Sequence, residues 1–161
     1  MRKSAIFGLF AVLAALPIVP AKALCSYHGE LYARTTVEQE FRDSRWVGRA
    51  RVVSGDYHWS DSGESWTLYR LEAIETFKGK LPKRFTFFTE RNSGGFYMDG
   101  KTDAVPDLGA EYLLFLQPTP HPNVAPEAKG ALRVNYECGQ SRRWSEVSSR
   151  EDGLLRKLGR P

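Results

Sequence analysis

The chain has 161 residues, of which 42% are hydrophobic and 26% are charged, so it is long enough for one domain with a hydrophobic core. Basic side chains outnumber acidic ones by 23 to 19, but Arg2, Lys3 and Lys22 lie within the first 23 positions, which contain no acid. The rest of the chain is therefore close to neutral, which excludes a bulk electrostatic attraction to nucleic acid. We expect no nucleic-acid partner.

The first 23 residues are typical of a secretory signal peptide. A basic start is followed by an apolar run of about a dozen residues, and Ala21 and Ala23 supply small residues at positions −3 and −1 of a cut after Ala23. The apolar run is shorter than the ~20 residues that a membrane-spanning helix needs. We therefore expect residues 1–23 to be removed, and residues 24–161 to form one exported domain, periplasmic or extracellular, with no membrane span.

Cys25 and Cys138 are the two cysteines of the chain. An exported protein folds in an oxidising compartment, so we expect a disulfide between Cys25 and Cys138 that ties the start of the mature chain to its end. Neither residue belongs to a Cys-x-x-Cys pair and no histidine cluster accompanies them, which argues against a metal site or a reactive thiol. Lipidation of Cys25 is the alternative, but Leu24 stands where a lipoprotein signal has a small residue.

Two helices and five strands are predicted along the mature chain. Thr35 and Glu38 have the capping-box spacing, and Val37 and Phe41 share one face, which indicates a short helix within residues 33–44. A second helix is expected within residues 144–158. The expected strands are residues 46–52, 66–77, 84–89, 112–116 and 132–136, with a hairpin turn at 78–82 and loops at 54–65 and 91–107.

Three of these strands carry further signals. Gly48 in the first strand favours a bulge or a sharp bend. The apolar face of the second strand changes after Trp66 and Leu68, as expected for a coiled strand that serves two sides of a barrel. The fourth strand is apolar throughout, which indicates burial on both faces. Together the elements predict a mainly β protein.

The best match in strand number is a five-stranded barrel of the oligonucleotide/oligosaccharide-binding (OB) type, with a short N-terminal helix and a C-terminal helix. Closure of such a barrel leaves no long sheet edge exposed. A β-sandwich is the alternative, but it usually has seven strands.

The chain also resembles the bacterial netrin-like, or tissue-inhibitor-of-metalloproteinases-like (TIMP-like), domains. The segments that carry the resemblance follow the expected order: 24–26, 47–53, 74–79, 108–115 and 138–141. The resemblance implies a netrin-like OB-fold barrel and a cystine between its first and last parts. In the animal inhibitors of this fold, a mature chain that begins with cysteine places its amino group on the zinc of a protease. Here the expected cut leaves Leu24 ahead of Cys25.

No enzyme motif is found in the sequence. It lacks His-Glu-x-x-His, Gly-x-Ser-x-Gly, a phosphate-binding glycine loop and a metal-spaced cysteine pair. His28, His58 and His121 fall in segments predicted to be irregular. His58 near Asp56 and Asp61 is a weak metal candidate that we interpret as a set of solvated loop residues. We expect no catalytic residues, no cofactor and no metal.

Aromatic and basic side chains that could stack against a ligand are Trp59, Trp66, Tyr69, Arg70, Phe96 and Tyr97, although we expect most of them to pack internally. Phe96, Tyr97 and Met98 lie in the long loop 91–107 and form the candidate protein-contact loop. We predict an exported, non-enzymatic binding or interaction module with an exported or envelope protein as partner. The alternatives are a metalloprotease inhibitor acting through the mature N-terminus, and a barrel that binds glycan or other cell-envelope material.

Overall fold

The computed structural model describes residues 26–27, 30–31, 35–61, 63–91, 95–101, 105–120, 125–136 and 138–160, and every structural statement below concerns these residues. The expected signal peptide and Cys25 lie outside them. Within these ranges, no helix combines the length and the apolar character needed to cross a membrane.

The fold is mainly β, as predicted from the sequence. The strands are β1 (Ser26–Tyr27), β2 (Glu30–Leu31), β3 (Trp46–Trp59), β4 (Ser65–Lys78), β5 (Arg84–Glu90), β6 (Glu111–Pro118), β7 (Leu132–Arg133) and β8 (Arg142–Arg143). The helices are α1 (Val37–Asp43) and α2 (Ser149–Leu158), together with two 3₁₀ turns, η1 (Pro126–Ala128) and η2 (Trp144–Glu146).

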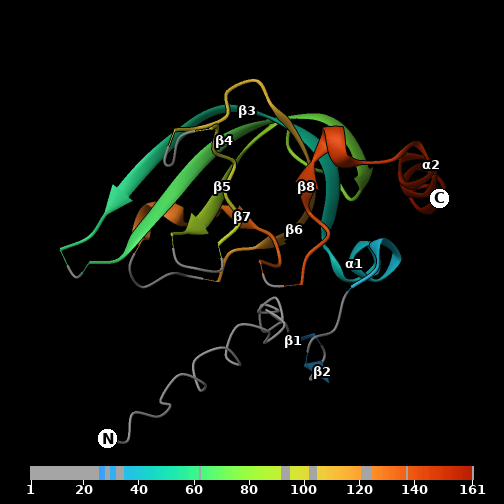
Figure 1. Cartoon of the computed structure of the whole chain (residues 1–161), viewed down its shortest axis with the longest axis horizontal. Coiled ribbons are helices and arrows are strands. Elements are labelled where there is room, and N and C mark those ends of the chain that lie inside the picture. The colour runs from blue at the N-terminus through green and yellow to red at the C-terminus, as the bar shows by residue number, and fades with distance from the viewer. Residues whose placement is uncertain are drawn as a thin grey trace, which may run out of the picture.

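Five strands pair in a closed ring. The order of pairing is β3-β4-β5-β7-β6, and β6 returns to β3 along residues 111–116. All neighbours are antiparallel except β5 and β7, which are parallel and pair at Phe87 and Leu132. Figure 1 shows the long, curved hairpin of β3 and β4 on one side of the ring, with α1 and α2 near one end.

Bulges explain the curvature of the β3–β4 hairpin. Its register shifts between Val47 and Gly48, between Arg49 and Ala50, and again at Val53. Each extra residue bends the strand and increases its twist, and a curved hairpin can close a ring. The irregularity predicted at Gly48 is present as a register shift next to it, but the extra residue is Phe77 of the partner strand β4. A Cβ on Gly48 would lie only 2.9 Å from the backbone oxygen of Glu75.

The first long strand extends beyond the predicted range. The sequence predicts a strand over residues 46–52 and a loop from 54 to 65, whereas β3 continues to Trp59 and pairs with β4 up to Ser65. The Ser-, Gly- and Asp-rich composition was therefore misleading for residues 54–59. Antiparallel pairing with the strongly β-forming start of β4 prevails over the weak local propensity of these residues.

The core forms on both sides of the sheet. The inside of the ring is filled by a cluster of buried residues: Ala50, Val52, Tyr69, Leu71, Phe87, Met98, Tyr112, Leu114, Leu116, Leu132 and Val134. Along β6, Leu113 and Phe115 point the other way, into a second cluster with Phe41 of α1 and Leu155 of α2. The prediction that this strand is buried on both faces is therefore confirmed.

The helices form near the predicted places but with different ends. The capping box of α1 is formed by Thr36 and Gln39 rather than Thr35 and Glu38, because the side chain of Thr35 is buried and faces Glu40. The C-terminal segment 144–158 forms η2 first, and α2 begins only after the capping residue Ser148.

The last ring strand is shorter than predicted. The sequence predicts residues 132–136, but β7 covers only Leu132–Arg133. The amide of Asn135 instead donates to the carboxylate of Glu40 at 3.3 Å, so the chain leaves the sheet to reach α1.

Candidate binding cleft

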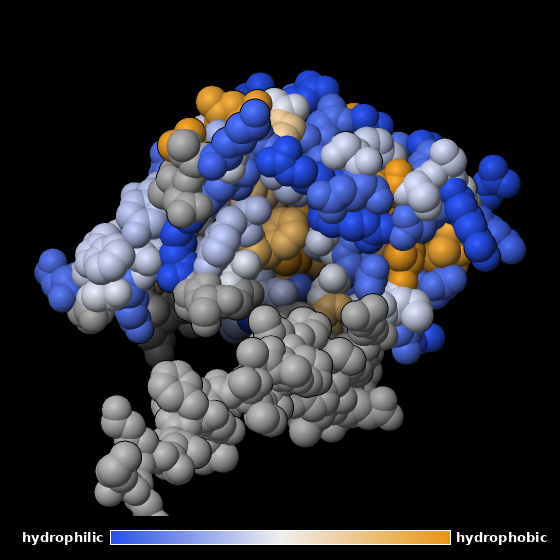
Figure 2. Space-filling model, in the orientation of Figure 1, coloured by the Kyte–Doolittle hydropathy of each residue, from blue (hydrophilic) through white to orange (hydrophobic). Residues whose placement is uncertain are grey.

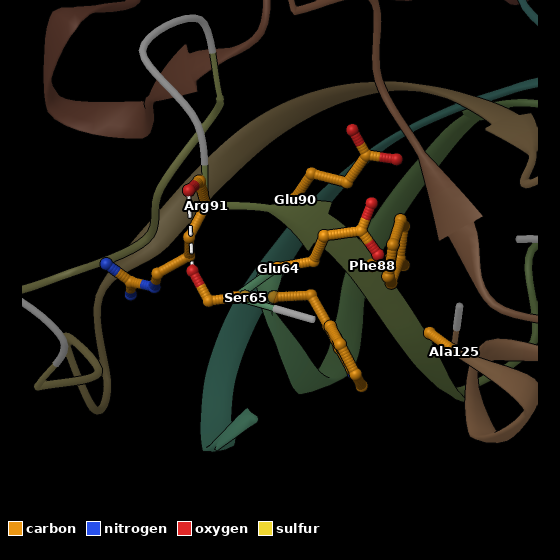
Figure 3. A pocket seen from close by; sticks show the side chains of 8 residues that line it. Glu64, Ser65, Phe88, Glu90, Arg91 and Ala125 are labelled. Atoms are coloured by element: carbon orange, nitrogen blue, oxygen red, sulfur yellow. Dashed lines mark hydrogen bonds between the residues drawn. The ribbon is translucent and has the colours of Figure 1, made fainter. Parts of the chain in front are cut away.

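A cleft opens at one end of the ring, where β4 begins and β5 ends. It holds about 310 Å³ and is lined by Gly63, Glu64, Ser65, Trp66, Phe88, Glu90, Arg91 and Ala125 (Figure 3). These residues come from the loop between β3 and β4, from two adjacent strands, and from the segment that precedes η1. The sheet register explains their convergence, since Trp66 pairs with Glu90.

The floor of the cleft is apolar and well supported. Trp66, Phe88 and Ala125 are buried in a third cluster beneath η1. The indole N–H of Trp66 donates to the carboxylate of Glu127 at 2.9 Å, and the ring of His58 stacks on the indole with ring centroids 5.6 Å apart. Because both the edge and the face of the indole have partners, its orientation is fixed before any ligand arrives.

The rim is polar and carries two carboxylates. In Figure 3 the side chains of Glu64 and Glu90 point to the same side of the pocket as Phe88, while the guanidinium of Arg91 lies at the opposite end. The backbone of Glu64 is held by Ser60 through hydrogen bonds of 2.8 and 3.0 Å. The acidic side of the rim therefore stands on an ordered loop.

Arg91 is held in place by its own network rather than left for a ligand. Its Nε donates to the hydroxyl of Thr67 at 2.8 Å, and its Nη2 lies 2.5 Å from Oδ2 of Asp99. The guanidinium also lies over two aromatic rings, 5.3 Å from the centroid of Tyr57 and 4.9 Å from that of Tyr97. Such stacking and ion pairing offset most of the positive charge that Arg91 would offer to a ligand.

The same network reaches the inside of the ring. The hydroxyl of Tyr69 donates to Asp99 at 2.5 Å and accepts the backbone N–H of Met98 at 3.2 Å. Burial, followed by the hydrogen bond and charge of Asp99, raises the pKa of Tyr69 far above its ordinary value. Tyr69 is therefore a neutral, structural phenol that anchors the loop after β5.

The three residues of the candidate protein-contact loop separate in the structure. Met98 is buried inside the ring, and the ring of Phe96 packs edge-on against Phe87 and Tyr112. Tyr97 is 36% exposed and covers the guanidinium of Arg91, a residue of the cleft. Of these three residues, Tyr97 is therefore the one that offers surface to a partner, and it lies beside the cleft.

The other sequence candidates are also dispersed. Trp66 and Tyr69 are buried, whereas Trp59 is 65% exposed at the end of β3 and Arg70 is exposed on β4. His58 lies 3.7 Å from the carboxylate of Glu127. In the described part of the chain, no three His, Cys, Asp or Glu side chains are grouped closely enough to hold a metal ion.

Sequence reasoning missed most of the residues that line the cleft. Glu64, the pair Phe88 and Glu90, and Ala125 come from three separate parts of the chain and belong to no motif. The pairing of the strand at 66–77 with the strand at 84–89 was the one signal that could have placed Glu90 beside Trp66.

Comparison with known proteins does not assign this cleft. No model of a known protein family matches the chain, and a search of curated proteins finds no matching sequence.

Proposed function

We propose that this protein is an exported, non-enzymatic interaction module with a netrin-like OB barrel, and that its cleft binds part of a protein partner. The order of the ring supports the OB fold. Counted along the chain from β3, the fifth ring strand is inserted between the third and the fourth. This gives a closed Greek-key ring of five strands, as in OB folds.

The position of the cleft carries the proposal. OB folds bind ligands at the face of their second and third strands, between the loops that join strands one and two and strands four and five. The corresponding elements here are β4, β5, the loop between β3 and β4, and the segment between β6 and β7. Residues from all four line the cleft, including Gly63 from the first loop and Ala125 from the second.

The lining defines the chemistry of the ligand. An aromatic floor with carboxylates on one side favours a cation on an apolar stem, which is the character of a lysine or arginine side chain. Glu64 makes no ion pair within the described residues, so its charge is available. The volume of about 310 Å³ is at the lower limit for a ligand pocket and suits one or two side chains of a partner.

Random peptides displayed on phage provide the probe for this site. They are selected on the mature protein, and enriched peptides are then titrated against wild type, Glu64→Arg and the control Glu146→Arg. Glu146 is an exposed carboxylate of η2, remote in sequence from the cleft. We expect enriched peptides to carry a basic residue beside an apolar one, and to bind Glu64→Arg about tenfold more weakly while Glu146→Arg stays within about twofold.

Other outcomes decide against the proposal. Failure to enrich any peptide, or equal binding by wild type and Glu64→Arg, would remove the cleft as a protein-binding site. Cell-wall oligosaccharides are titrated in parallel, and their Glu64-dependent binding in place of peptides would favour the glycan alternative. Zinc-protease inhibition that depends on the mature N-terminus, and not on Glu64, would favour the inhibitor alternative.

A further inference from the structure

A second groove lies on β3, β4 and β5 and shares no lining residue with the cleft. It holds about 410 Å³ and is lined by Val53, Arg70, Leu71, Arg84, Phe85 and Thr86. Three adjacent strands contribute to it. Its lining is an apolar base with two exposed arginines, which differs from the acidic rim of the cleft.

A β-bulge supplies the apolar part that faces solvent. Val52 pairs with Leu71 and Ser54 pairs with Arg70, so Val53 is the extra residue that has no partner on β4. A bulge redirects the side chain of the extra residue, and the Val53 side chain is 52% exposed. The exposed valine therefore stands beside the groove and can be covered by an apolar side chain of a partner.

The two arginines of the groove stand close together without partners. Arg70 pairs with Thr86 across the β4–β5 ladder, and Arg84 lies two residues before Thr86. Diagonal positions of this kind are separated by about 7–8 Å. Within the described residues neither guanidinium makes an ion pair, a hydrogen bond to a side chain or a contact with an aromatic ring. The nearest carboxylate by register is Glu72, opposite Arg84, and it does not line the groove.

Other arginines on the same sheet behave differently. Arg49 and Arg51 on β3 share the carboxylate of Glu111, and Arg91 binds Asp99. The sheet therefore neutralises these arginines and leaves a like-charged pair beside Val53. Unpaired like charges at this separation repel each other, and an anionic partner would remove that repulsion.

We propose that this groove docks an extended acidic segment of a protein partner. Two carboxylates two residues apart on a strand project from the same face, separated by about 6.6 Å, and so match the two guanidiniums. Each guanidinium can hold a carboxylate through two parallel hydrogen bonds. An apolar residue two positions before the first acid falls over Val53. The motif that fits is apolar-x-Asp/Glu-x-Asp/Glu.

The apolar base favours a peptide over a phosphate or a polyanionic sugar. Val53 and the half-buried Phe85 offer no hydrogen bonds from their side chains to an anion, and they gain from burial only if the ligand is itself partly apolar. Leu71 already packs inside the ring. The inference is independent of the proposed function, because the cleft and the groove have opposite charge and separate residues.

The test uses short fluorescent peptides on the mature protein. The probe is acetyl-Leu-Ser-Asp-Ser-Asp-amide, with variants in which the acids are adjacent or three apart, an Asn-for-Asp version and a Ser-for-Leu version. The protein variants are Arg70→Gln with Arg84→Gln, Val53→Ser, and Arg150→Gln as the control. Arg150 is an exposed arginine of α2 that also has no ion-pair partner within the described residues. Unchanged melting temperatures establish that each variant is folded.

We expect saturable binding of the Asp-x-Asp probe that weakens about tenfold with Asn, about tenfold in the double arginine variant and about threefold in Val53→Ser. Arg150→Gln and Glu64→Arg should stay within about twofold, and added salt should weaken binding. The proposal is overturned if no acidic peptide binds at about 1 mM, or if the double variant binds normally. It is also overturned if inorganic phosphate displaces the probe and the Ser-for-Leu peptide binds equally well, because the groove would then be a simple anion site.

Discussion

Two carboxylates hold distant parts of this chain together, and they do so in opposite electrostatic environments. Glu40 of α1 is 3% exposed and accepts hydrogen bonds from Thr35, from Asn135 and from the backbone N–H of Gln140 at 2.9 Å. All of these donors are neutral. Burial, the largest effect, raises the pKa of Glu40 although the hydrogen bonds act to lower it.

Glu111 of β6 instead lies between two arginines. Arg49 donates to it at 2.5 Å and Arg51 at 2.7 Å. Partial burial acts to raise its pKa, but the hydrogen bonds and charges of Arg51 and Arg49 together outweigh that effect and lower the pKa. The contrast shows that the seam between α1 and residues 135–140 relies on hydrogen bonds from neutral donors, whereas the side-chain link that Glu111 makes from β6 to β3 relies on charge.

The predicted cystine would hold the same seam as Glu40, and its removal should have the largest effect on the free energy of unfolding. The hydroxyl of Thr35 contacts the carbonyl oxygen of Cys138, so Cys138 belongs to this seam, while Cys25 lies outside the described residues. Replacing both cysteines by serine should lower the free energy of unfolding by about 4 kcal/mol, because a loop spanning nearly the whole mature chain is no longer closed.

Urea denaturation of the mature protein, with and without reductant, measures this loss. The double serine variant, which should not respond to reductant, is the control. Intact masses before and after reduction give an independent check, since formation of one disulfide removes two hydrogens. Reaction of native, unreduced protein with a thiol reagent at both cysteines would contradict the pairing.

Removal of the Glu40 carboxylate should have the next largest effect on the free energy of unfolding. Glu40→Ala leaves the donors of Asn135 and Gln140 without their acceptor in a buried site, whereas the Thr35 hydroxyl keeps the carbonyl oxygen of Cys138. The expected loss of unfolding free energy is about 3 kcal/mol. Glu40→Gln keeps one acceptor oxygen and should cost about half as much. Urea denaturation at neutral pH is the measurement.

The matched control is Glu38→Ala, two positions away on the exposed side of α1. Its effect should stay within about 0.5 kcal/mol, as expected for a surface substitution. Equal losses for Glu38→Ala and Glu40→Ala would show that helix propensity, and not the buried hydrogen bonds, accounts for the result.

The comparison also shows what the sequence could predict. The period-two pattern of strands and the apolar run 112–116 depend on local spacing, so the main strands were found close to their observed positions. The network of Glu40 joins residues separated by 95 and 100 positions, and no local pattern encodes such contacts. This network ends the last ring strand after Arg133, where the sequence predicted that it continues to residue 136.

The cleft and the loop after β5 were missed for a related reason. Met98 lies among glycines with no periodic neighbours, which favours a loop on the surface, but the ring needs a side chain to fill its interior and Met98 supplies it. Glu64 and Glu90 have no motif in common, and the pairing of β4 with β5 places them on one rim. Features that depend on strand pairing became visible only in three dimensions.

The pH dependence of stability is the smallest expected effect, but it tests the comparison of Glu40 with Glu111 most specifically. The contributions of the two carboxylates to stability should change in opposite directions with pH. The pKa of folded Glu40 is raised, so its protonation contributes stability that is fully present below the unfolded value of about 4.3 and is lost as pH rises through the folded pKa. The pKa of folded Glu111 is lowered, so its contribution is present above about 4.3 and is lost as pH falls through the folded pKa.

The difference in unfolding free energy between wild type and a variant with glutamine in place of one glutamate isolates the contribution of that carboxylate. As pH falls from 7 to 4, the stability advantage of wild type over Glu40→Gln should grow, whereas below about pH 4.3 its advantage over Glu111→Gln should shrink. Urea denaturation across a pH series measures both, and the other carboxylates cancel because all three proteins share them. Glu72→Gln, which removes a sheet carboxylate with no ion pair among the described residues, is the control substitution. If the advantage of wild type over both variants changes in the same direction as pH falls, the two carboxylates do not lie in opposite electrostatic environments. The contrast between Glu40 and Glu111 would then be wrong.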